Sequence, residues 1–159
     1  MNKTKSLFLS LILVAVISII SYSFGFLYNN TASMSLGFYK LDKLEKYTPK
    51  KEDIIVLKIP TINNKLLKKV VATNGDKVIV SPKGVYINDI LLKNSDIFEF
   101  GSDGKPLQAN FMNKVLKEDE IFVMGENNMS YDSRYFGVVN LKVSKIEKIS
   151  KFYTWEKNK

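Results

Sequence analysis

The sequence predicts a mainly β domain that follows one membrane-spanning helix. Residues 7–27 form an apolar run without a charged side chain, long enough to cross a bilayer. From residue 50 onward, short runs rich in β-branched residues alternate with Gly, Pro, Asn and Asp, a pattern typical of strands joined by turns. Once a membrane segment is subtracted from 159 residues, there is room for one modest domain. We therefore expect a single β domain, residues 28–159, on a membrane anchor.

The apolar run is expected to be a retained signal anchor. At about 1.5 Å rise per residue it would be about 31 Å long, which matches a hydrocarbon core of about 30 Å. The core of a cleaved signal peptide would be about 7–15 residues long and would end at small residues in an A-x-A-like site. No such site lies in residues 22–30. The side chains expected at the far membrane interface are aromatic: Tyr22, Phe24, Phe26 and Tyr28.

The charges around the run predict its orientation. Lys3 and Lys5 precede it, whereas residues 28–39 carry no charge. The positive-inside rule then puts residues 1–6 in the cytoplasm and residues 28–159 outside. We expect a single-pass protein of the cytoplasmic (inner) membrane with its domain on the outer, periplasmic side. Ser33 would lie close to the outer membrane surface, where it would meet peptide bonds that emerge from the bilayer.

The β domain is expected to contain short strands closed by turn signals. The clearest turns are the Asn-Gly pair at residues 74–75 and the hairpin turn at residues 82–84. Residues 95–113 mix Gly, Pro and polar residues and are expected to be a loop region. From Val143 apolar residues recur at every third position, which fits neither a strand nor a helix. The expected strands are residues 53–59, 66–72, 77–81, 85–88, 90–92, 120–125 and 138–143.

The charge balance and the missing residue types limit the chemistry. The formal net charge is +8, but the lysines are scattered between apolar residues, so a solvated surface beside a membrane is favoured over a nucleic-acid-binding surface. The chain has no cysteine and no histidine. This excludes thiol chemistry and an imidazole base, argues against a zinc site, and leaves no cofactor expected. A serine hydrolase of this composition would need lysine as its base.

Three segments in a fixed order carry a family resemblance. They read TASMSLGFY at residues 31–39, LKKVVATNGDKV at residues 67–78 and SYDSRYFG at residues 130–137. In this order the chain resembles the type I signal peptidase superfamily, and most of all its conjugative-transfer, TraF-type branch. The resemblance covers nearly the whole chain, including the anchor. It implies an irregular, β-barrel-like signal peptidase fold and a serine endopeptidase with a Ser-Lys dyad.

The resemblance also implies a role for individual residues. Ser33 would be the nucleophile and Lys68 the general base. The Thr31 hydroxyl, together with the Ser33 backbone N–H, would donate to the oxyanion of the tetrahedral intermediate. The supporting residues would be Ser130, which orients the lysine, and Asp132 and Arg134, which buttress the site. Glu126 matches an acidic position of the last segment, which is one residue shorter here than in housekeeping peptidases.

Two choices stay open from the residues alone. The family's proline two residues after the nucleophile is Ser35 here, so either Ser33 or Ser35 could attack, and the spacing back from Gly37 favours Ser33. Strand alternation puts Lys68 and Lys69 on opposite faces of a strand without saying which face is buried. The register of the family selects Lys68.

Two physical arguments stand beside the resemblance. A general base must be neutral, whereas a free lysine has a pKa of about 10.4. Burial among apolar side chains can lower that pKa by about 3 units, which corresponds to about 4 kcal/mol. Arg134 is the only arginine in a chain that uses lysine for every other cation. A bidentate contact with Asp132 would explain why lysine is not equivalent at this position.

Three functions are consistent with these observations. The leading hypothesis is a membrane-anchored serine endopeptidase that removes leader peptides from exported precursors, most of all a conjugative pilin. Family resemblance implies small residues before the cut. The alternatives are a housekeeping signal peptidase I with broad substrates, and a non-catalytic, membrane-tethered β scaffold of a secretion or conjugation assembly. The expected partners are a precursor protein, the lipid bilayer and conjugation or secretion machinery, with no nucleic acid.

Overall fold

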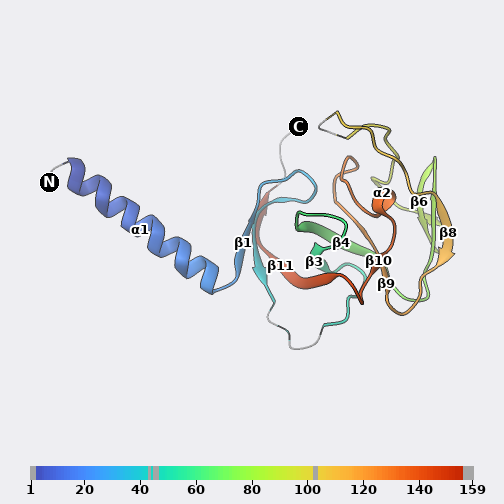
Figure 1. Cartoon of the computed structure of the whole chain (residues 1–159), viewed down its shortest axis with the longest axis horizontal. Helices are drawn as coiled ribbons and strands as arrows, with labels where there is room; N and C mark the ends of the chain where they lie inside the picture. The colour runs from blue at the N-terminus through green and yellow to red at the C-terminus, as the bar shows by residue number, and fades with distance from the viewer. Residues whose placement is uncertain (1–2, 43, 45–46, 102–103, 156–159) are drawn as a thin grey trace.

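The computed structural model describes residues 3–42, 44, 47–101 and 104–155. The first element is the helix α1, Lys3–Ser23, which extends away from the rest of the protein and buries none of its residues (Figure 1). Its length and composition suffice to cross a membrane, which confirms the predicted N-terminal apolar helix. The helix is shifted toward the N-terminus relative to the predicted span of residues 7–27. It ends early because Gly25, at φ +75°, turns the chain and donates its N–H to the Tyr22 carbonyl at 3.0 Å.

The larger sheet has seven antiparallel strands, and the residues of the predicted site lie on its strands, on adjoining loops or, for Arg134, on a short helix. The strand order of the sheet is β1-β2-β11-β3-β4-β9-β10. In that order the strands are Phe26–Asn29, Leu36–Leu41, Lys145–Trp155, Ile54–Lys58, Leu66–Ala72, Glu120–Met124 and Val139–Asn140. The short helix α2, Ser133–Phe136, lies between β9 and β10 in the chain. Strands near the two ends of the chain are therefore neighbours in the sheet.

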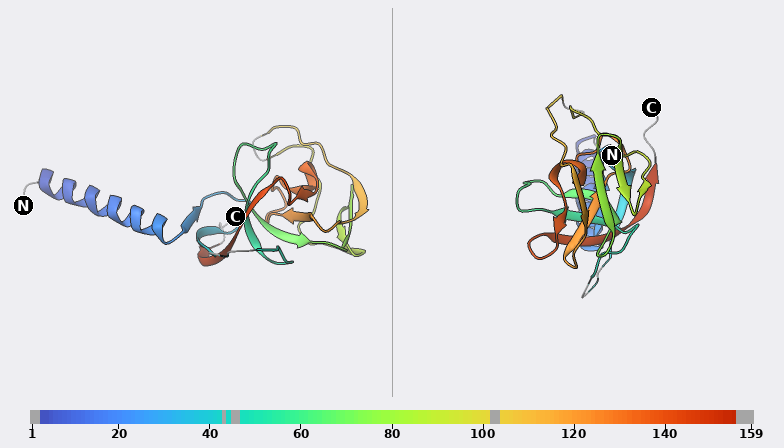
Figure 2. Two further views of the ribbon diagram at one scale, coloured as in Figure 1. Left: turned by 60° about the horizontal axis from the view of Figure 1, so that its bottom comes forward. Right: turned by 90° about the vertical axis from the view of Figure 1, so that its right-hand side faces the viewer.

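The smaller sheet has four antiparallel strands in the order β7-β6-β5-β8, at the end of the domain away from α1 (Figure 2). Its strands are Ile90–Leu91, Gly84–Ile87, Lys77–Ser81 and Met112–Val115. Ser81 pairs with Gly84, so Pro82 and Lys83 form the predicted hairpin turn. Asn88 and Asp89 turn the chain from β6 to β7 with φ values of +51° and +67°, as a type I′ turn requires.

The core joins the two sheets and confirms the predicted mainly β fold. Phe122 and Met124 of β9 pack with Val78 and Val85 of the smaller sheet. A second cluster is formed by strands of the larger sheet alone. Its buried residues are Ile55, Leu57, Val70, Ile121, Val123 and Val139. Each fully buried aliphatic side chain contributes about 1.5–3 kcal/mol, so the strands β3, β4 and β9 supply much of the apolar stabilisation of the domain.

Four parts of the chain differ from the expected pattern. One is β8, which was not predicted and begins at Met112, inside the expected loop of residues 95–113. Strands β1 and β2 flank Ser33 but were not predicted, because their apolar residues continue the composition of the preceding span. Only Val139 and Asn140 form a strand within residues 138–143. The tail that fitted no period is β11, whose pairing with β2 shifts register between Lys151 and Tyr153. This bulge places one extra residue in the strand and breaks its alternation.

The end of the domain next to α1 is rich in exposed aromatic side chains. Phe26 packs edge-on against Phe152, with ring centroids 4.8 Å apart, and Tyr28 contacts Phe38 at 5.2 Å. Ile17 of α1 lines one groove with these strands. Aromatic side chains prefer the boundary between lipid and water, so this end of the domain suits a position at a membrane surface.

Candidate active site

Ser33 lies in the loop of residues 30–35 that joins β1 to β2, and the side chain of Asn29 holds this loop from within. Asn29 Nδ2 donates to the carbonyls of Thr31, Met34 and Ser35 at 3.1, 3.2 and 3.0 Å. Its Oδ1 accepts from the Thr31 N–H at 3.1 Å and from the Thr31 hydroxyl at 2.7 Å. The sequence analysis did not identify Asn29. An asparagine at the entry of a loop is the signal that could have found it, because asparagine readily bonds to backbone groups a few residues on.

Lys68 is buried in the centre of the larger sheet. It lies on β4 and is 2% exposed, whereas Lys69 points to the other face and pairs with Glu52 at 2.5 Å. The structure therefore settles which lysine faces inward, in favour of Lys68. Burial lowers the pKa of Lys68 to about 8, while the nearby charge of Asp132 raises it and that of Arg134 lowers it.

One glycine connects the serine loop to the lysine. Lys69 of β4 pairs with Met124 of β9, so the next residues, Lys68 and Gly125, occupy neighbouring positions. The Ser33 carbonyl accepts the Glu126 N–H at 2.8 Å, which brings the loop against this point. A Cβ at Gly125 would lie 2.6 Å from the Ser33 carbonyl oxygen, so only glycine permits this approach.

Ser130 reaches the same point from the loop between β9 and α2. Its side chain is 2% exposed and would collide with a Cβ at Gly125. Within the described part of the chain, the Ser130 hydroxyl has no hydrogen-bond partner. A buried hydroxyl without a partner is costly, and catalytic sites are one place where such groups are retained.

The Asp132–Arg134 ion pair is fully buried and confirms the predicted bidentate contact. Arg134 Nε and one terminal nitrogen donate to the two oxygens of Asp132, each at 2.8 Å. The other three guanidinium N–H groups donate to backbone carbonyls, those of Asp96, Asn128 and Ser130, at 2.7, 2.6 and 3.0 Å. Asp132 also accepts the Gly125 N–H at 2.9 Å. All five donors of the guanidinium are used, which a lysine could not reproduce.

Ser35, the alternative nucleophile, is committed to other contacts. Its backbone N–H and its hydroxyl donate to Glu126 Oε2 at 2.7 and 2.5 Å. Lys151 donates to the Ser35 hydroxyl at 3.1 Å and to Glu126 Oε1 at 2.7 Å. Among the residues that the structure describes, neither Ser33 Oγ nor Lys68 Nζ makes a hydrogen bond, and none joins the two. The Ser33–Lys68 dyad stays a prediction.

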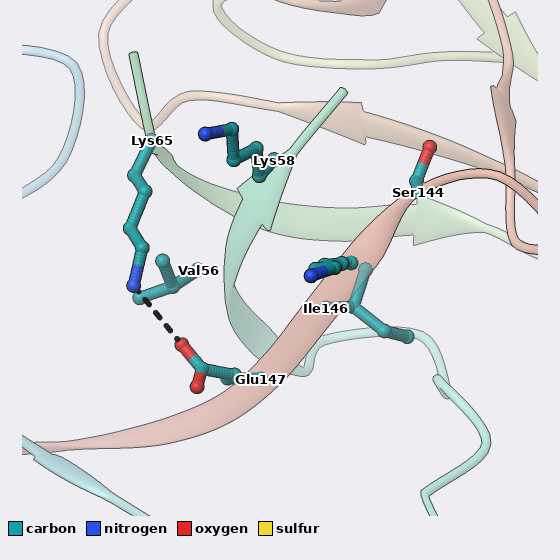
Figure 3. A pocket seen from close by; sticks show the side chains of 7 residues that line it. Val56, Lys58, Lys65, Ser144, Ile146 and Glu147 are labelled. Carbon is teal, nitrogen blue, oxygen red and sulfur yellow. Dashed lines mark ion pairs between the residues drawn. The ribbon is translucent and has the colours of Figure 1, made fainter. Parts of the chain in front are cut away.

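A groove lined by lysines lies elsewhere in the domain (Figure 3). It contains Lys58, Lys65 and Glu147, and Lys65 reaches Glu147 at 3.6 Å. Val56, which also lines it, pairs with Leu67 and shares its face of the sheet. Because successive side chains of a strand point to opposite faces, Lys68 faces away from this groove. The groove is therefore separate from the serine loop and the buried lysine.

The fold and the site define a β domain on an apolar helix, with a buried lysine beside a serine-bearing loop. Residues 2–155 match the family model described as signal peptidase, peptidase S26. The chain belongs to this family, which confirms the resemblance found in the sequence.

Three curated relatives are similar to parts of the chain. The plasmid transfer protein TraF of Escherichia coli is 34% identical over 77 residues, 47% of this chain and 44% of TraF. The thylakoidal processing peptidase 1 of Arabidopsis thaliana is 28% identical over 123 residues, 70% of this chain and 34% of that protein. The probable signal peptidase I-2 of a Synechocystis strain is 30% identical over 103 residues, 57% of this chain and 42% of that protein. The matches thus span less than half of each relative's length.

A solved structure is also similar to the chain. It is the crystal structure of a signal peptidase I from Enterococcus faecalis V583, with a TM-score of 0.39 and 23% sequence identity. The match covers 62% of this chain and 95% of that one.

Proposed function

We propose that this protein is a membrane-anchored serine endopeptidase that removes leader peptides from exported precursors, with Ser33 as nucleophile and Lys68 as general base. The observation that carries the proposal is the burial of Lys68 in the sheet, beside the glycine on which the Ser33 loop packs. At pH 7 a lysine whose pKa is about 8 is neutral in about one molecule in ten, several hundred times more often than a lysine with the ordinary pKa of 10.5. Family membership supports the same reaction.

The first step is attack on the scissile carbonyl. Neutral Lys68 Nζ takes the proton of the Ser33 hydroxyl as Ser33 Oγ bonds to the carbonyl carbon. The resulting ammonium then gives a proton to the nitrogen of the leaving segment, and the peptide C–N bond breaks. The products of this half-reaction are the free amine of the mature protein and a leader peptide esterified to Ser33. Lysine supplies both transfers because it is neutral before the attack and charged after it.

The oxyanion of the tetrahedral intermediate needs donors close to Ser33. The Ser33 backbone N–H is one, and the Thr31 hydroxyl is the other that family resemblance suggests. In the free enzyme the Thr31 hydroxyl donates to Asn29 Oδ1 at 2.7 Å, so it must rotate toward the substrate during the reaction. One oxyanion donor contributes about 10²–10³-fold to the rate in serine proteases.

The second half-reaction is hydrolysis of the ester. Lys68, neutral again after the amine leaves, takes a proton from a water molecule that attacks the acyl carbon, and Ser33 recovers its proton. Ser130 is suited to orient the Lys68 amine, because its buried hydroxyl packs at the same glycine. The Asp132–Arg134 pair fixes the backbone around Ser130 through the Arg134 contact to the Ser130 carbonyl.

The substrate is proposed to be a precursor whose cleavage site emerges at the outer membrane surface. The apolar helix α1 ends only ten residues before Ser33, which keeps the serine near the membrane. The charges around α1 favour a cytoplasmic N-terminus and a domain on the outer, periplasmic side of the inner membrane. Similarity to a plasmid transfer protein supports a conjugative pilin as the precursor and a conjugation machinery as the partner.

The test is cleavage of a candidate precursor by the full chain in detergent or lipid vesicles. We expect Ser33→Ala and Lys68→Ala each to lose activity by about 10³-fold or more. Lys69→Ala is the matched control, because Lys69 lies next to Lys68 on β4 but pairs with Glu52 on the other face, and this variant should retain most activity. A protein that still cleaves after Ser33→Ala contradicts the mechanism.

The choice of precursor separates the remaining alternatives. Efficient cleavage of a generic secretory leader would favour a housekeeping peptidase over an enzyme for one pilin. A non-catalytic scaffold would support conjugation or secretion in cells equally well with Ser33→Ala and Lys68→Ala. Loss of that function in both variants, with unchanged protein levels, would exclude the scaffold.

A further inference from the structure

Glu126 bonds to the loop that carries Ser33 through both its main chain and its side chain. The Glu126 backbone N–H donates to the Ser33 carbonyl at 2.8 Å. Its carboxylate accepts from the Ser35 backbone N–H and hydroxyl at 2.7 and 2.5 Å. Glu126 therefore bonds to the main chain on both sides of Met34, whose side chain is itself buried.

A lysine on a distant strand fixes the carboxylate in turn. Lys151 of β11 donates to Glu126 Oε1 at 2.7 Å, while Oε2 takes the two bonds from Ser35. The two oxygens thus have separate partners, one on β11 and one in the serine loop. Burial alone would raise the pKa of Glu126, but the hydrogen bonds from Lys151 and Ser35 lower it below its ordinary value. The carboxylate is therefore charged at neutral pH.

We infer that Glu126 is a positioning residue for the reaction, which sets the place of Ser33 by clamping the main chain of its loop between β11 and the loop after β9. The inference rests on the proposed function, because it takes Ser33 as the nucleophile. The three side chains of this clamp are Ser35, Glu126 and Lys151.

The clamp acts where the loop has no strand pairing of its own. The last residue pair of β1 and β2 is Asn29 with Gly37, so residues 30–35 lie beyond the end of this ladder. Asn29 bonds to this loop from within, and Tyr39 donates to the Ser35 carbonyl at 2.7 Å. Among the described residues, the side chains of Glu126 and Lys151 join the loop to elements outside the β1–β2 hairpin by charged contacts, and Glu126 makes two of them. Displacement of a reacting atom by about 1 Å can cost about 10²-fold in rate.

The experiment measures kcat and KM of full-chain variants on a cleavable precursor. Glu126→Ala should lower kcat by about 10²-fold and Glu126→Gln by about 10-fold, with KM changed less than about twofold, because the precursor's contacts remain while Ser33 is misplaced. Lys151→Met should lower kcat about threefold, and Lys151→Arg, which keeps the ion pair, should restore it. Glu147→Gln is the matched control, since Glu147 is an ion-paired glutamate of β11 outside the site.

A coupling test separates positioning from general stability. Ser35→Pro removes the N–H that Glu126 accepts, whereas Ser35→Ala keeps it. In the native background Ser35→Pro should cost more kcat than Ser35→Ala, and in the Glu126→Ala background the two should cost the same. Equal costs in the native background, or an unchanged kcat in Glu126→Gln, would overturn the inference.

Folding and mechanism are checked in the same series. Thermal unfolding of each variant identifies loss of the fold, and if Glu126→Ala does not fold, the Lys151 and Ser35 variants decide the question by the same criteria. Loss of activity in Ser33→Ala with normal kcat in the clamp variants refutes the clamp alone. Full activity in Ser33→Ala refutes the proposed function and the clamp with it.

Discussion

Two lysines around the candidate site, Lys151 and Lys68, are in opposite environments. Lys151 donates to Ser35 at 3.1 Å, but it is 38% exposed and bound to the carboxylate of Glu126. The Lys68 amine makes no hydrogen bond within the described part of the chain, yet Lys68 is 2% exposed and its pKa is lowered to about 8. The lysine with the printed contact to a serine is therefore the exposed one that binds a carboxylate, whereas the other lysine is removed from water.

The comparison teaches that proton state, more than proximity in a resting structure, marks a lysine base. A neighbouring carboxylate stabilises the charged form of an amine, whereas removal from water lowers the pKa of an amine and raises its neutral fraction. Hydrogen bonds between catalytic groups are often long or absent before substrate binds. The buried lysine is thus the better candidate for base, and the exposed one is better suited to hold a loop.

The largest effect is expected from Lys68→Met, which should abolish activity while it stabilises the fold. The folded-state pKa of about 8 lies below the ordinary value of 10.5, so below pH 8 the native protein bears the full cost of a buried ammonium. Removing the amine should raise the free energy of unfolding by about 3 kcal/mol at pH 7. The gain should shrink as pH rises from 8 toward 10.5, where the folded lysine is already neutral and the unfolded one loses its proton. Thermal unfolding at several pH values measures it.

Lys69→Met is the control for that experiment, because Lys69 lies on the same strand but faces Glu52 at the surface. It should change stability by less than about 1 kcal/mol at any of these pH values. If Lys68→Met were less stable than the native protein at pH 7, the buried ammonium would not cost the folded state the free energy that its lowered pKa implies.

The buried cation Arg134 gives the next largest effect, on stability. Arg134→Lys keeps the charge but offers at most three donors to five buried acceptor contacts. The variant should lose about 3 kcal/mol of stability, measured by chemical unfolding. The reverse exchange at the exposed site, Lys151→Arg, should change stability by less than about 0.5 kcal/mol. Equal losses of stability in Arg134→Lys and Lys151→Arg would contradict the claim that the buried cation depends on the guanidinium and the exposed one does not.

Gly125→Ala should lower activity by about 10²-fold by moving the Ser33 loop away from Lys68. The added Cβ would press on the Ser33 carbonyl and on the Ser130 side chain. Gly75→Ala is the control: its Cβ would meet nothing within 4 Å, but its φ of +83° makes alanine strained. That variant should lose stability and keep kcat. Normal kcat in Gly125→Ala would mean that the close approach at Gly125 does not position the site.

Local patterns predicted the parts of the site that depend on composition. The charge-free run predicted α1, and the use of a single arginine predicted the Arg134–Asp132 pair. The choice of Lys68 over Lys69 came from the family register, because alternation on β4 is symmetric between the two faces. The face of β4 that is buried depends on the pairing of β4 with β3 and β9. Residues 120–124 of β9 are far from β4 in the sequence, so the local pattern of β4 does not show which face this is.

The clamp around Ser35 could not be predicted for a related reason. Ser35 and Glu126 are 91 residues apart and Ser35 and Lys151 are 116 apart, so no local pattern links them. Lys151 reaches the loop next to the bulge of β11, which also hid that strand from any regular period. Strands β1 and β2 were not predicted because aromatic residues that follow a membrane span are expected both at the membrane interface and in a sheet. Their composition therefore does not distinguish the two structures.

The most direct test of the central claim is the titration of the Lys68 amine in the full chain. Lysine labelled with ¹³C at Cε can be followed by NMR, with Lys68→Met to assign the signal. The account predicts a midpoint near pH 8, with precursor cleavage rising over the same pH range. A midpoint near the ordinary value of 10.5, or cleavage that does not follow this titration, would contradict the assignment of Lys68 as the general base.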